Sequence, residues 1–199
     1  MAIEHVAIAL ASILLAILIT RIIGEEFAWI NRKIIHFSII PAILMLHKGY
    51  ISPGIFSAFA FLFAILQLIL HLRKAELKWF QISGNYGEVF FAFSSAILPL
   101  VLESEKAVPI LLTMAISDGI TGIIRFEYFR KKGVNAKLRK HWSGSIGFFA
   151  STLTIFALFG FSLRFSLVSA TILTLAEYQR FVDDNIAVPL VGAIVIASI

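Results

Sequence analysis

Long apolar segments separated by short charged stretches constrain the fold of this chain more than any other feature. A helix needs about 20 residues to cross the hydrocarbon core of a bilayer, with a usual range of about 17–25. Most segments reach or approach that length. The second, seventh and eighth are short, so flanking polar residues extend them or, for the second, the chain re-enters the membrane. We expect an all-α, polytopic transmembrane helical bundle of about eight membrane helices, forming one domain over residues 1–199. The eight segments are residues 3–23, 34–46, 51–72, 86–102, 108–124, 145–160, 163–176 and 186–199.

The composition supports this class and excludes several others. The chain is 59% hydrophobic and 15% charged, whereas soluble domains have about 45–50% apolar and about 25% charged residues. Cysteine is absent, which excludes disulfides and thiolate metal sites. A net charge of +5 on so apolar a chain does not indicate a nucleic-acid partner. We expect the basic residues to set topology and to meet membrane lipids or phosphates.

The connections between apolar segments alternate along the chain between rich and poor in lysine and arginine. Rich connections mark the cytoplasmic side, which predicts that both termini lie outside. It also places Asp118, Lys140 and the Asp183–Asp184 pair on the inner side, as expected of one site at the cytoplasmic boundary. The N-terminal segment lacks a basic n-region and a clear cleavage site, so we expect a first membrane helix rather than a signal peptide. Successive connections hold three (Arg21, Arg32, Lys33), one (Lys48), three (Arg73, Lys74, Lys78), one (Lys106), seven (residues 125–140), one (Arg164) and one (Arg180).

Asp118 is a carboxylate inside an apolar segment. Inserting such a group costs roughly 2.5–3.5 kcal/mol on insertion scales, so it indicates a function. Gly122 and Arg125 follow at four and seven residues and share its helical face. We expect Asp118 to bind metal or nucleotide; the alternative is an ion pair with a basic residue of another helix.

Asp183, Asp184 and Asn185 offer three oxygen ligands before the last apolar segment. Such ligands suit Mg²⁺, which is commonly held by one or two carboxylates together with substrate phosphates. The alternative is ordinary helix capping, which needs only one of them. Glu177 lies six residues earlier and could orient water, bind metal or take a proton from a substrate hydroxyl.

Lys140 stands beside a helix start rich in small residues, Ser143, Gly144 and Ser145. Free backbone N–H groups at a helix start bind phosphate, so we expect these residues to contact a nucleotide. The remaining basic residues of the connection 125–141 read as a solvated inner loop.

Arg32, Lys33 and His36 open the second segment, and Lys33 and His36 share a face. They are phosphate-binding candidates; the alternative is an interfacial anchor with a buried histidine. The scattered histidines include no H-E-x-x-H pair, which argues against zinc.

Helix starts and glycines are expected to gather on the same face. Even-numbered segments would begin at the cytoplasm, and free N–H groups there would favour a polyphosphate. Glycines three apart predict close helix packing, with approach of phosphate to the backbone as a functional addition. The expected caps are Asn31, Ser83 or Asn85, Ser143, and Asp183 or Asp184; the glycine pairs are Gly84/Gly87, Gly119/Gly122 and Gly144/Gly147.

Four short motifs together resemble the CTP-dependent polyprenol kinases, the family of dolichol, phytol and farnesol kinases. They occupy residues 32–36, 117–119, 140–145 and 183–189, and the resemblance runs from about residue 31 to 190. The K-x-W-x-G-S form of residues 140–145 is closer to the phytol and farnesol branch. Departures are Ser143 where dolichol kinases tend to have Glu, and the lack of G-R-R-F-G after Gly119.

The resemblance implies transfer of the γ-phosphoryl of CTP to an isoprenoid alcohol such as geranylgeraniol, phytol, farnesol or dolichol, with a divalent cation. Catalytic roles would fall on Asp118, Lys140, Asp183 and Asp184, with Glu177 as a candidate base. Asp118, Asp183 and Asp184 would hold Mg²⁺. Nucleotide-binding positions would be Arg32, Lys33, His36, Gly119, Lys140, Ser143, Gly144, Ser145 and Asn185.

The isoprenoid tail would come from the bilayer, along a phenylalanine-rich face such as Phe90, Phe91 and Phe93. The short chain favours a shorter alcohol than dolichol. Two other functions stay open: a cytidylyltransferase acting on a lipid phosphate, and a small cation transporter, which the apolar outer halves disfavour. The sequence leaves open CTP against ATP, the alcohol, and the oligomeric state, a homodimer included.

Overall fold

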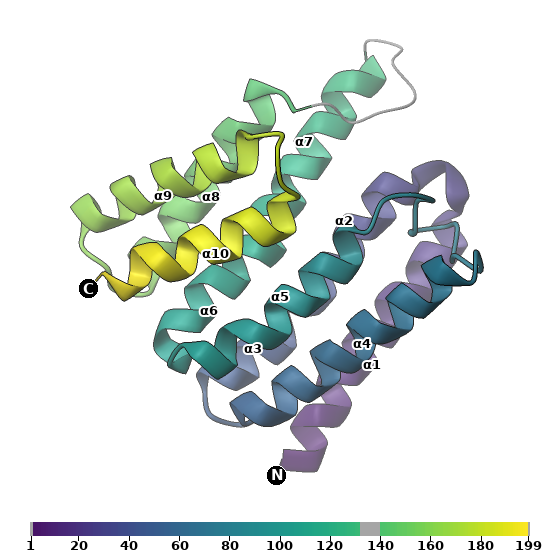
Figure 1. Ribbon diagram of the computed structural model, residues 1–199, viewed down its shortest axis with the longest axis horizontal. Coiled ribbons are helices and arrows are strands. Elements are labelled where there is room, and N and C mark those ends of the chain that lie inside the picture. Colours follow the sequence, from purple (N-terminus) through teal and green to yellow (C-terminus); the bar gives the residue numbers. More distant parts are fainter. Residues whose placement is uncertain (1, 132–139, 199) are drawn as a thin grey trace.

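The computed structural model describes residues 2–131 and 140–198, and every regular element within them is a helix (Figure 1). The all-α prediction is therefore confirmed for these residues. Residues 132–139 of the basic connection lie outside the described residues. The elements are α1 (Ala2–Ile23), η1 (Glu25–Phe27), α2 (Ala28–Ser38), α3 (Ile40–His47), α4 (Pro53–Leu72), α5 (Gly87–Val101), α6 (Ser104–Leu112), η2 (Thr113–Ser117), α7 (Asp118–Lys131), α8 (Trp142–Leu158), α9 (Leu163–Tyr178) and α10 (Asp184–Ala197).

Helices cover all eight predicted apolar segments, but not all are long enough to cross a bilayer. Four helical runs within the described residues are long and apolar enough to do so: Ile3–Ile23, Glu25–His47, Pro53–Leu72 and Ser104–Lys131. The run 25–47 contains the short second segment, which polar residues of η1 and α2 lengthen. The helices α5, α8 and α10 are apolar but shorter. Eight spans therefore go beyond what helix length and composition establish.

Local sequence signals set several helix ends. The Ser52 side chain accepts a hydrogen bond from the Ile55 backbone N–H at 3.3 Å, and Pro53 follows at the first turn of α4. Ser162 caps α9 in the same way. Gly160 follows α8 at a φ of 81°, a left-handed conformation that glycine adopts without a Cβ clash. These signals turn the chain sharply between neighbouring antiparallel helices.

The run α6–η2–α7 forms the centre of the bundle. Of its most apolar window, 78% is buried, against 17% for α1. Helix α2 packs on α7, α5 packs on α4 and α10, and α8 packs on α7 and α9. Figure 1 shows α1–α4 on one side of this centre and α8–α10 on the other. The exposed surface of α1 and α4 is largely apolar, with Leu14, Ile22 and Leu62 more than half exposed, as suits contact with lipid.

The predicted phenylalanine face is not a single face. Phe91 is buried against the His36 ring, with centroids 4.0 Å apart. Phe93 is exposed and contacts Phe61 of α4. Residues two positions apart on a helix point in widely different directions, so Phe91 and Phe93 do not share a face.

Candidate active site

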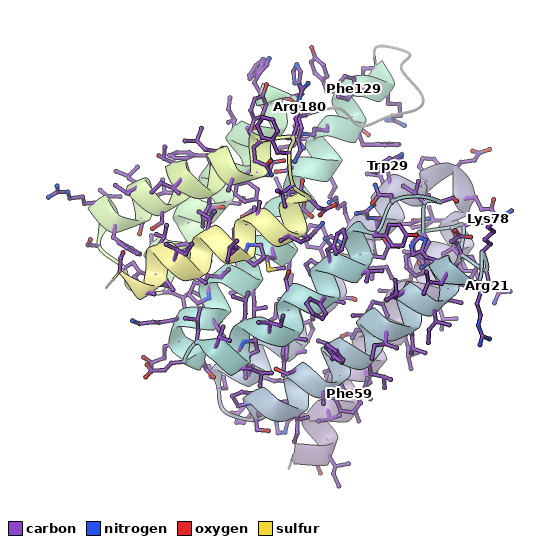
Figure 2. All side chains as sticks on the ribbon, in the orientation of Figure 1. Arg21, Trp29, Phe59, Lys78, Phe129 and Arg180 are labelled. Atoms are coloured by element: carbon purple, nitrogen blue, oxygen red, sulfur yellow. The ribbon has the colours of Figure 1, made fainter. Side chains whose placement is uncertain are left out.

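A polar cavity of about 400 Å³ lies where the starts of α2, α5, α8 and α10 come together around α7. Five cationic side chains and three carboxylates line it. Figure 2 shows Trp29 and Arg180, from opposite sides of this cavity, in the upper part of the view. The lining residues are Trp29, Arg32, Lys33, Asn85, Asp118, Gly122, Arg125, Lys140, Gln179, Arg180, Phe181, Val182, Asp183 and Asp184.

A π-helical turn aims Asp118 at this cavity. The turn η2 ends at Ser117, directly before Asp118. The preceding helix α6 contains Pro109, which has no N–H for a regular α-helical hydrogen bond. The hydroxyl of Thr113 donates to the Pro109 carbonyl at 2.9 Å. Such π-turns are frequent at functional sites.

Lys33 and His36 of α2 both contact the Asp118 carboxylate. Lys33 Nζ donates to Asp118 Oδ2 at 2.6 Å, and His36 Nδ1 lies 3.0 Å from the same oxygen without hydrogen-bond alignment. The prediction that Lys33 and His36 share a face is confirmed, as is the shared face of Asp118, Gly122 and Arg125 along the cavity. The alternative expected for Asp118, an ion pair with a basic residue of another helix, is present. Metal or nucleotide binding by Asp118 stays a prediction.

Glycines make room for the cations. A Cβ on Gly122 would lie 2.4 Å from Lys33 Cε, one on Gly87 would lie 2.0 Å from Arg32 Nη2, and one on Gly144 would lie 2.6 Å from Arg125 Nε. The predicted close helix packing is therefore confirmed at these positions. Its consequence is that long cationic side chains cross between helices and reach the cavity.

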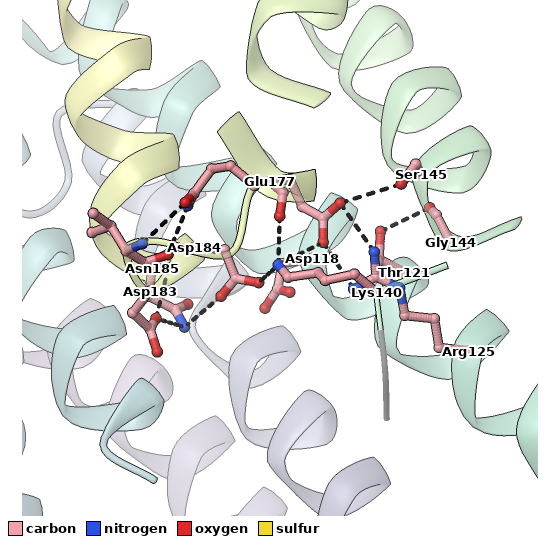
Figure 3. Close-up of polar contacts among 12 residues, drawn as sticks. Asp118, Thr121, Arg125, Lys140, Gly144, Ser145, Glu177, Asp183, Asp184 and Asn185 are labelled. Atoms are coloured by element: carbon pink, nitrogen blue, oxygen red, sulfur yellow. Dashed lines mark hydrogen bonds and ion pairs between the residues drawn. The ribbon is translucent and has the colours of Figure 1, made fainter. Parts of the chain in front are cut away.

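Lys140 joins two acidic groups next to α8. Its ammonium donates to the carboxylates of Asp184 and Glu177 and to the Glu177 carbonyl (Figure 3). Arg125 Nη1 also pairs with Glu177 Oε1, at 2.8 Å. Glu177 is fully buried between these two cations. It therefore holds Lys140 and Arg125 in place rather than facing the cavity.

The sequence 183–185 folds back on itself at the start of α10. Asp183 Oδ1 accepts the Asn185 backbone N–H at 2.9 Å, which confirms Asp183 as the cap. The Asn185 amide donates to Asp183 at 2.9 Å and to Asp184 at 3.3 Å. One amide thus orients both carboxylates toward the cavity.

The pKa values of two groups reflect this arrangement. Burial would lower the pKa of Lys140, but Asp184 and Glu177 outweigh it and raise the pKa above its usual value. Burial raises the pKa of the Asp183 carboxyl, and the charge of Asp184 raises it further. Lys140 thus stays charged, while Asp183 is a stronger base than an ordinary aspartate.

The predicted site residues divide into two groups. Six line the polar cavity: Arg32, Lys33, Asp118, Lys140, Asp183 and Asp184. Seven do not line it among the described residues: His36, Glu177, Asn185, Gly119, Ser143, Gly144 and Ser145. His36, Glu177 and Asn185 contact the lining side chains from behind. Gly119 packs against Phe37 and Gly144 against Arg125, while Ser143 and Ser145 lie in the first turn of α8.

Two predicted caps are wrong. Asn31 lies inside α2, buried, and its amide donates to the Thr20, Gly24 and Trp79 carbonyls. Ser143 lies in the first turn of α8, where the His141 side chain is the cap. Asn85 does accept the Gly87 N–H, at 3.0 Å, and also accepts Arg32 Nη1, at 2.8 Å.

A second buried carboxylate, Glu88, was not singled out from the sequence. Glu88 Oε1 lies 2.5 Å from His71 Nε2, and Glu88 Oε2 lies 3.8 Å from Arg32 Nε. The signal was present, because Glu88 is a charge within an apolar segment and such charges are costly. Its place at the segment start made it resemble a helix-end residue. Arg180 and Gln179 of the cavity were also missed, since their segment reads as an ordinary connection.

The carboxylates suit a divalent cation in their chemistry. Asp118, Asp183 and Asp184 supply hard oxygen donors to one cavity, and Mg²⁺ takes one or two protein carboxylates alongside phosphate oxygens. In the described part of the chain, no group of three or more His, Asp or Glu side chains is arranged so that it could hold a metal ion. A cation held here would therefore need oxygen atoms of a bound phosphate as further ligands.

Comparison of the chain with protein-family models, with curated proteins and with solved structures finds no match.

Proposed function

We propose that this chain is an integral-membrane kinase that transfers the γ-phosphoryl group of CTP to the hydroxyl of an isoprenoid alcohol. The polar cavity carries the proposal, because five cations and three carboxylates converge there from elements far apart in sequence. An excess of cations suits a triphosphate, and carboxylates beside them suit its metal ion. The motif resemblance over residues 32–36, 117–119, 140–145 and 183–189 supplies the choice of CTP and of an isoprenoid alcohol.

Phosphoryl transfer needs mainly positioning and charge neutralisation. Arg32, Arg125 and Lys140 would bind the phosphate oxygens from three sides of the cavity. Bound Mg²⁺, held by Asp118 and Asp184, would neutralise charge on the phosphates. Glu177 would keep Lys140 and Arg125 in place.

The alcohol oxygen would attack the γ-phosphorus as the bond from phosphorus to the CDP oxygen breaks. The hydroxyl proton would pass to a lining carboxylate. Asp183 is the best of the three for this role, because its pKa is raised. The other two carboxylates, each beside a lysine, would be engaged by the metal ion. The products are the lipid monophosphate and CDP.

The direct test uses purified protein with CTP or ATP labelled in the γ-phosphate. Farnesol, geranylgeraniol, phytol and dolichol are offered as acceptors, and Asp118→Asn is the inactive control. We expect a labelled lipid monophosphate and CDP. Formation of CMP-linked lipid and pyrophosphate would identify a cytidylyltransferase instead, and label transfer to no alcohol would refute the kinase.

We further propose eight membrane-crossing helices with the polar cavity at the cytoplasmic face. The alternation of basic connections supports this topology. Two exposed lysines test it, since the chain has no native cysteine. Lys131→Cys, at the end of α7, should react with impermeant thiol reagents only from the cytoplasm, and Lys48→Cys only from outside. The reverse pattern would overturn the orientation.

A further inference from the structure

An apolar cavity of about 560 Å³ lies between α1, α2, α4 and α5. Its volume falls within the range of about 300–1,000 Å³ that holds one small-molecule ligand. It extends along α1 from Val6 to Ile17 and along α4 from Ile55 to Leu70. Almost all of its lining is hydrocarbon, so water would be a poor occupant.

One side of this cavity opens between α1 and α4. Helix α1 packs on α2 and α3 and barely contacts α4. Leu14 of α1, and Leu62 and Leu66 of α4, line the cavity and are each half exposed or more. A hydrocarbon chain in the surrounding lipid could enter sideways between these two helices.

A few buried polar atoms face the cavity without a partner. Gln67 Oε1 and His36 Nε2 have no hydrogen bond, although both residues are at least 95% buried. Unsatisfied buried groups cost free energy, so each needs an explanation. A ligand that is apolar over its length and carries a hydroxyl at one end would give one of these atoms a hydrogen-bond partner.

His36 stands between the two cavities. It lines the apolar cavity and stacks on Phe91, while its Nδ1 lies 3.0 Å from Asp118, which lines the polar cavity. A hydroxyl directed past His36 would therefore approach the phosphate-binding groups. Its chain would run away from them along α4 toward Phe56.

We infer that this apolar cavity binds the hydrocarbon chain of a single-chain lipid alcohol, with the hydroxyl end directed past His36 toward the polar cavity and with Ala60 limiting the chain length. The inference rests on the proposed kinase function and adds two properties of the substrate: it has one hydrocarbon chain, and the length of that chain is limited. Ala60 is buried and lines the cavity seven residues before Gln67, roughly 10 Å along α4 at about 1.5 Å per residue. A larger side chain there would shorten the space left for the ligand.

The test compares Ala60→Phe with Ala58→Phe, the same change on an exposed position of α4 that does not line the cavity. Each methylene kept out of the cavity should lower affinity roughly four-fold. We expect Ala60→Phe to lose ~10-fold or more in kcat/KM for geranylgeraniol but less than ~3-fold for the shorter geraniol. Ala58→Phe should leave both values close to wild type.

A second measurement needs no variant and no turnover. A geranylgeraniol analogue with a diazirine at the tail end is photolysed with wild-type protein, and the labelled peptides are identified. Label on α1 or the first half of α4 is expected. Label confined to other helices would overturn the inference, even if Ala60→Phe fails to fold.

The outcomes separate this inference from the proposed function. If wild type phosphorylates geranylgeraniol and Ala60→Phe does so equally well, the chain lies elsewhere while the kinase stands. If no alcohol is phosphorylated but α1 or α4 is labelled, the cavity binds the chain and the kinase proposal fails. Phosphorylation of diacylglycerol as efficient as that of geranylgeraniol would overturn the single-chain assignment.

Discussion

Two buried carboxylates, Asp118 and Glu88, have similar neighbours and face different cavities. Each meets one of two adjacent cations of α2, Lys33 for Asp118 and Arg32 for Glu88. Each also has a histidine within 3.0 Å. Asp118 lines the polar cavity, whereas Glu88 lines the apolar one and is 2% exposed.

The difference shows that burial of a charge does not by itself locate a ligand site. Removing either carboxylate would leave a buried cation without its counter-charge. Only Asp118 also presents an oxygen to the cavity where phosphate and metal would bind. In the proposed kinase, Asp118 would take part in the reaction and Glu88 would position Arg32.

The largest effect should come from Asp118→Asn. A carboxamide is a poor Mg²⁺ ligand, and the change leaves Lys33 as an unopposed cation beside the phosphates. We expect turnover to fall by at least ~1,000-fold, in line with loss of a group that acts only in the transition state. Kinase assays at limiting and saturating Mg²⁺ measure it, with detergent-solubilised protein checked for retained helicity. Near-normal turnover in a folded Asp118→Asn variant would remove Asp118 from the site.

Lys140→Ala should cost less than Asp118→Asn but more than the loss of a loop charge. A charge-assisted contact to the nucleotide contributes ~1.5–3 kcal/mol, which is roughly ten- to a hundred-fold in kcat/KM for nucleotide. Lys131→Ala is the matched control, since Lys131 is exposed at the end of α7. Exposed charges are screened within about 8–10 Å at physiological salt.

Measurements at two salt concentrations distinguish the two lysines. The loss in Lys140→Ala should persist at high salt, and any loss in Lys131→Ala should shrink. Equal damage from the two changes would mean that the basic connection acts through its bulk field.

Glu88→Gln should act mainly on stability, whereas Asp118→Asn should act mainly on turnover. Breaking a buried ion pair costs about 3–5 kcal/mol, so thermal unfolding in detergent should shift to lower temperature. Turnover measured well below that temperature should fall by less than ~10-fold, because Arg32 keeps its bond to Asn85. A loss of turnover as large as that in Asp118→Asn would break the distinction between the two carboxylates.

The smallest effect concerns stability and Asp183. Its raised pKa means that folding favours its protonated form, so the ionised carboxylate lowers stability at neutral pH. Asparagine caps a helix about as well as aspartate. Asp183→Asn should therefore stabilise the protein by less than about 1 kcal/mol at neutral pH, since the group is partly exposed.

That gain should vanish as the pH falls through the raised pKa of Asp183 toward the ordinary aspartate value. Unfolding temperatures of wild type and variant across this pH window provide the measurement. The same variant should lose kinase activity, as expected where a site is held at some cost to stability. A gain that persists at low pH would have another origin.

Much of the fold could be predicted from the apolar segments alone. Hydrophobic runs of helical length leave the backbone no partner but itself in lipid, so all-α structure over residues 3–23, 51–72 and 108–124 follows from sequence. For the second segment, the sequence left open whether flanking polar residues extend the helix or the chain re-enters the membrane, and the structure shows the extended run Glu25–His47. Four of its polar residues, Asn31, Arg32, Lys33 and His36, are buried against other helices. Local sequence does not reveal that burial.

The sequence by itself singled out the candidate side chains, because charges such as Asp118 and Lys140 are conspicuous in an apolar chain. Only the tertiary structure decided which of them meet a common cavity. Gly144 proved to make room for Arg125, and Glu177 proved to be a buried anchor. The reason is physical: the direction of a side chain depends on how its helix is rotated against its neighbours. That rotation is set by packing across the bundle, as where glycines of α5 and α7 admit the cations of α2.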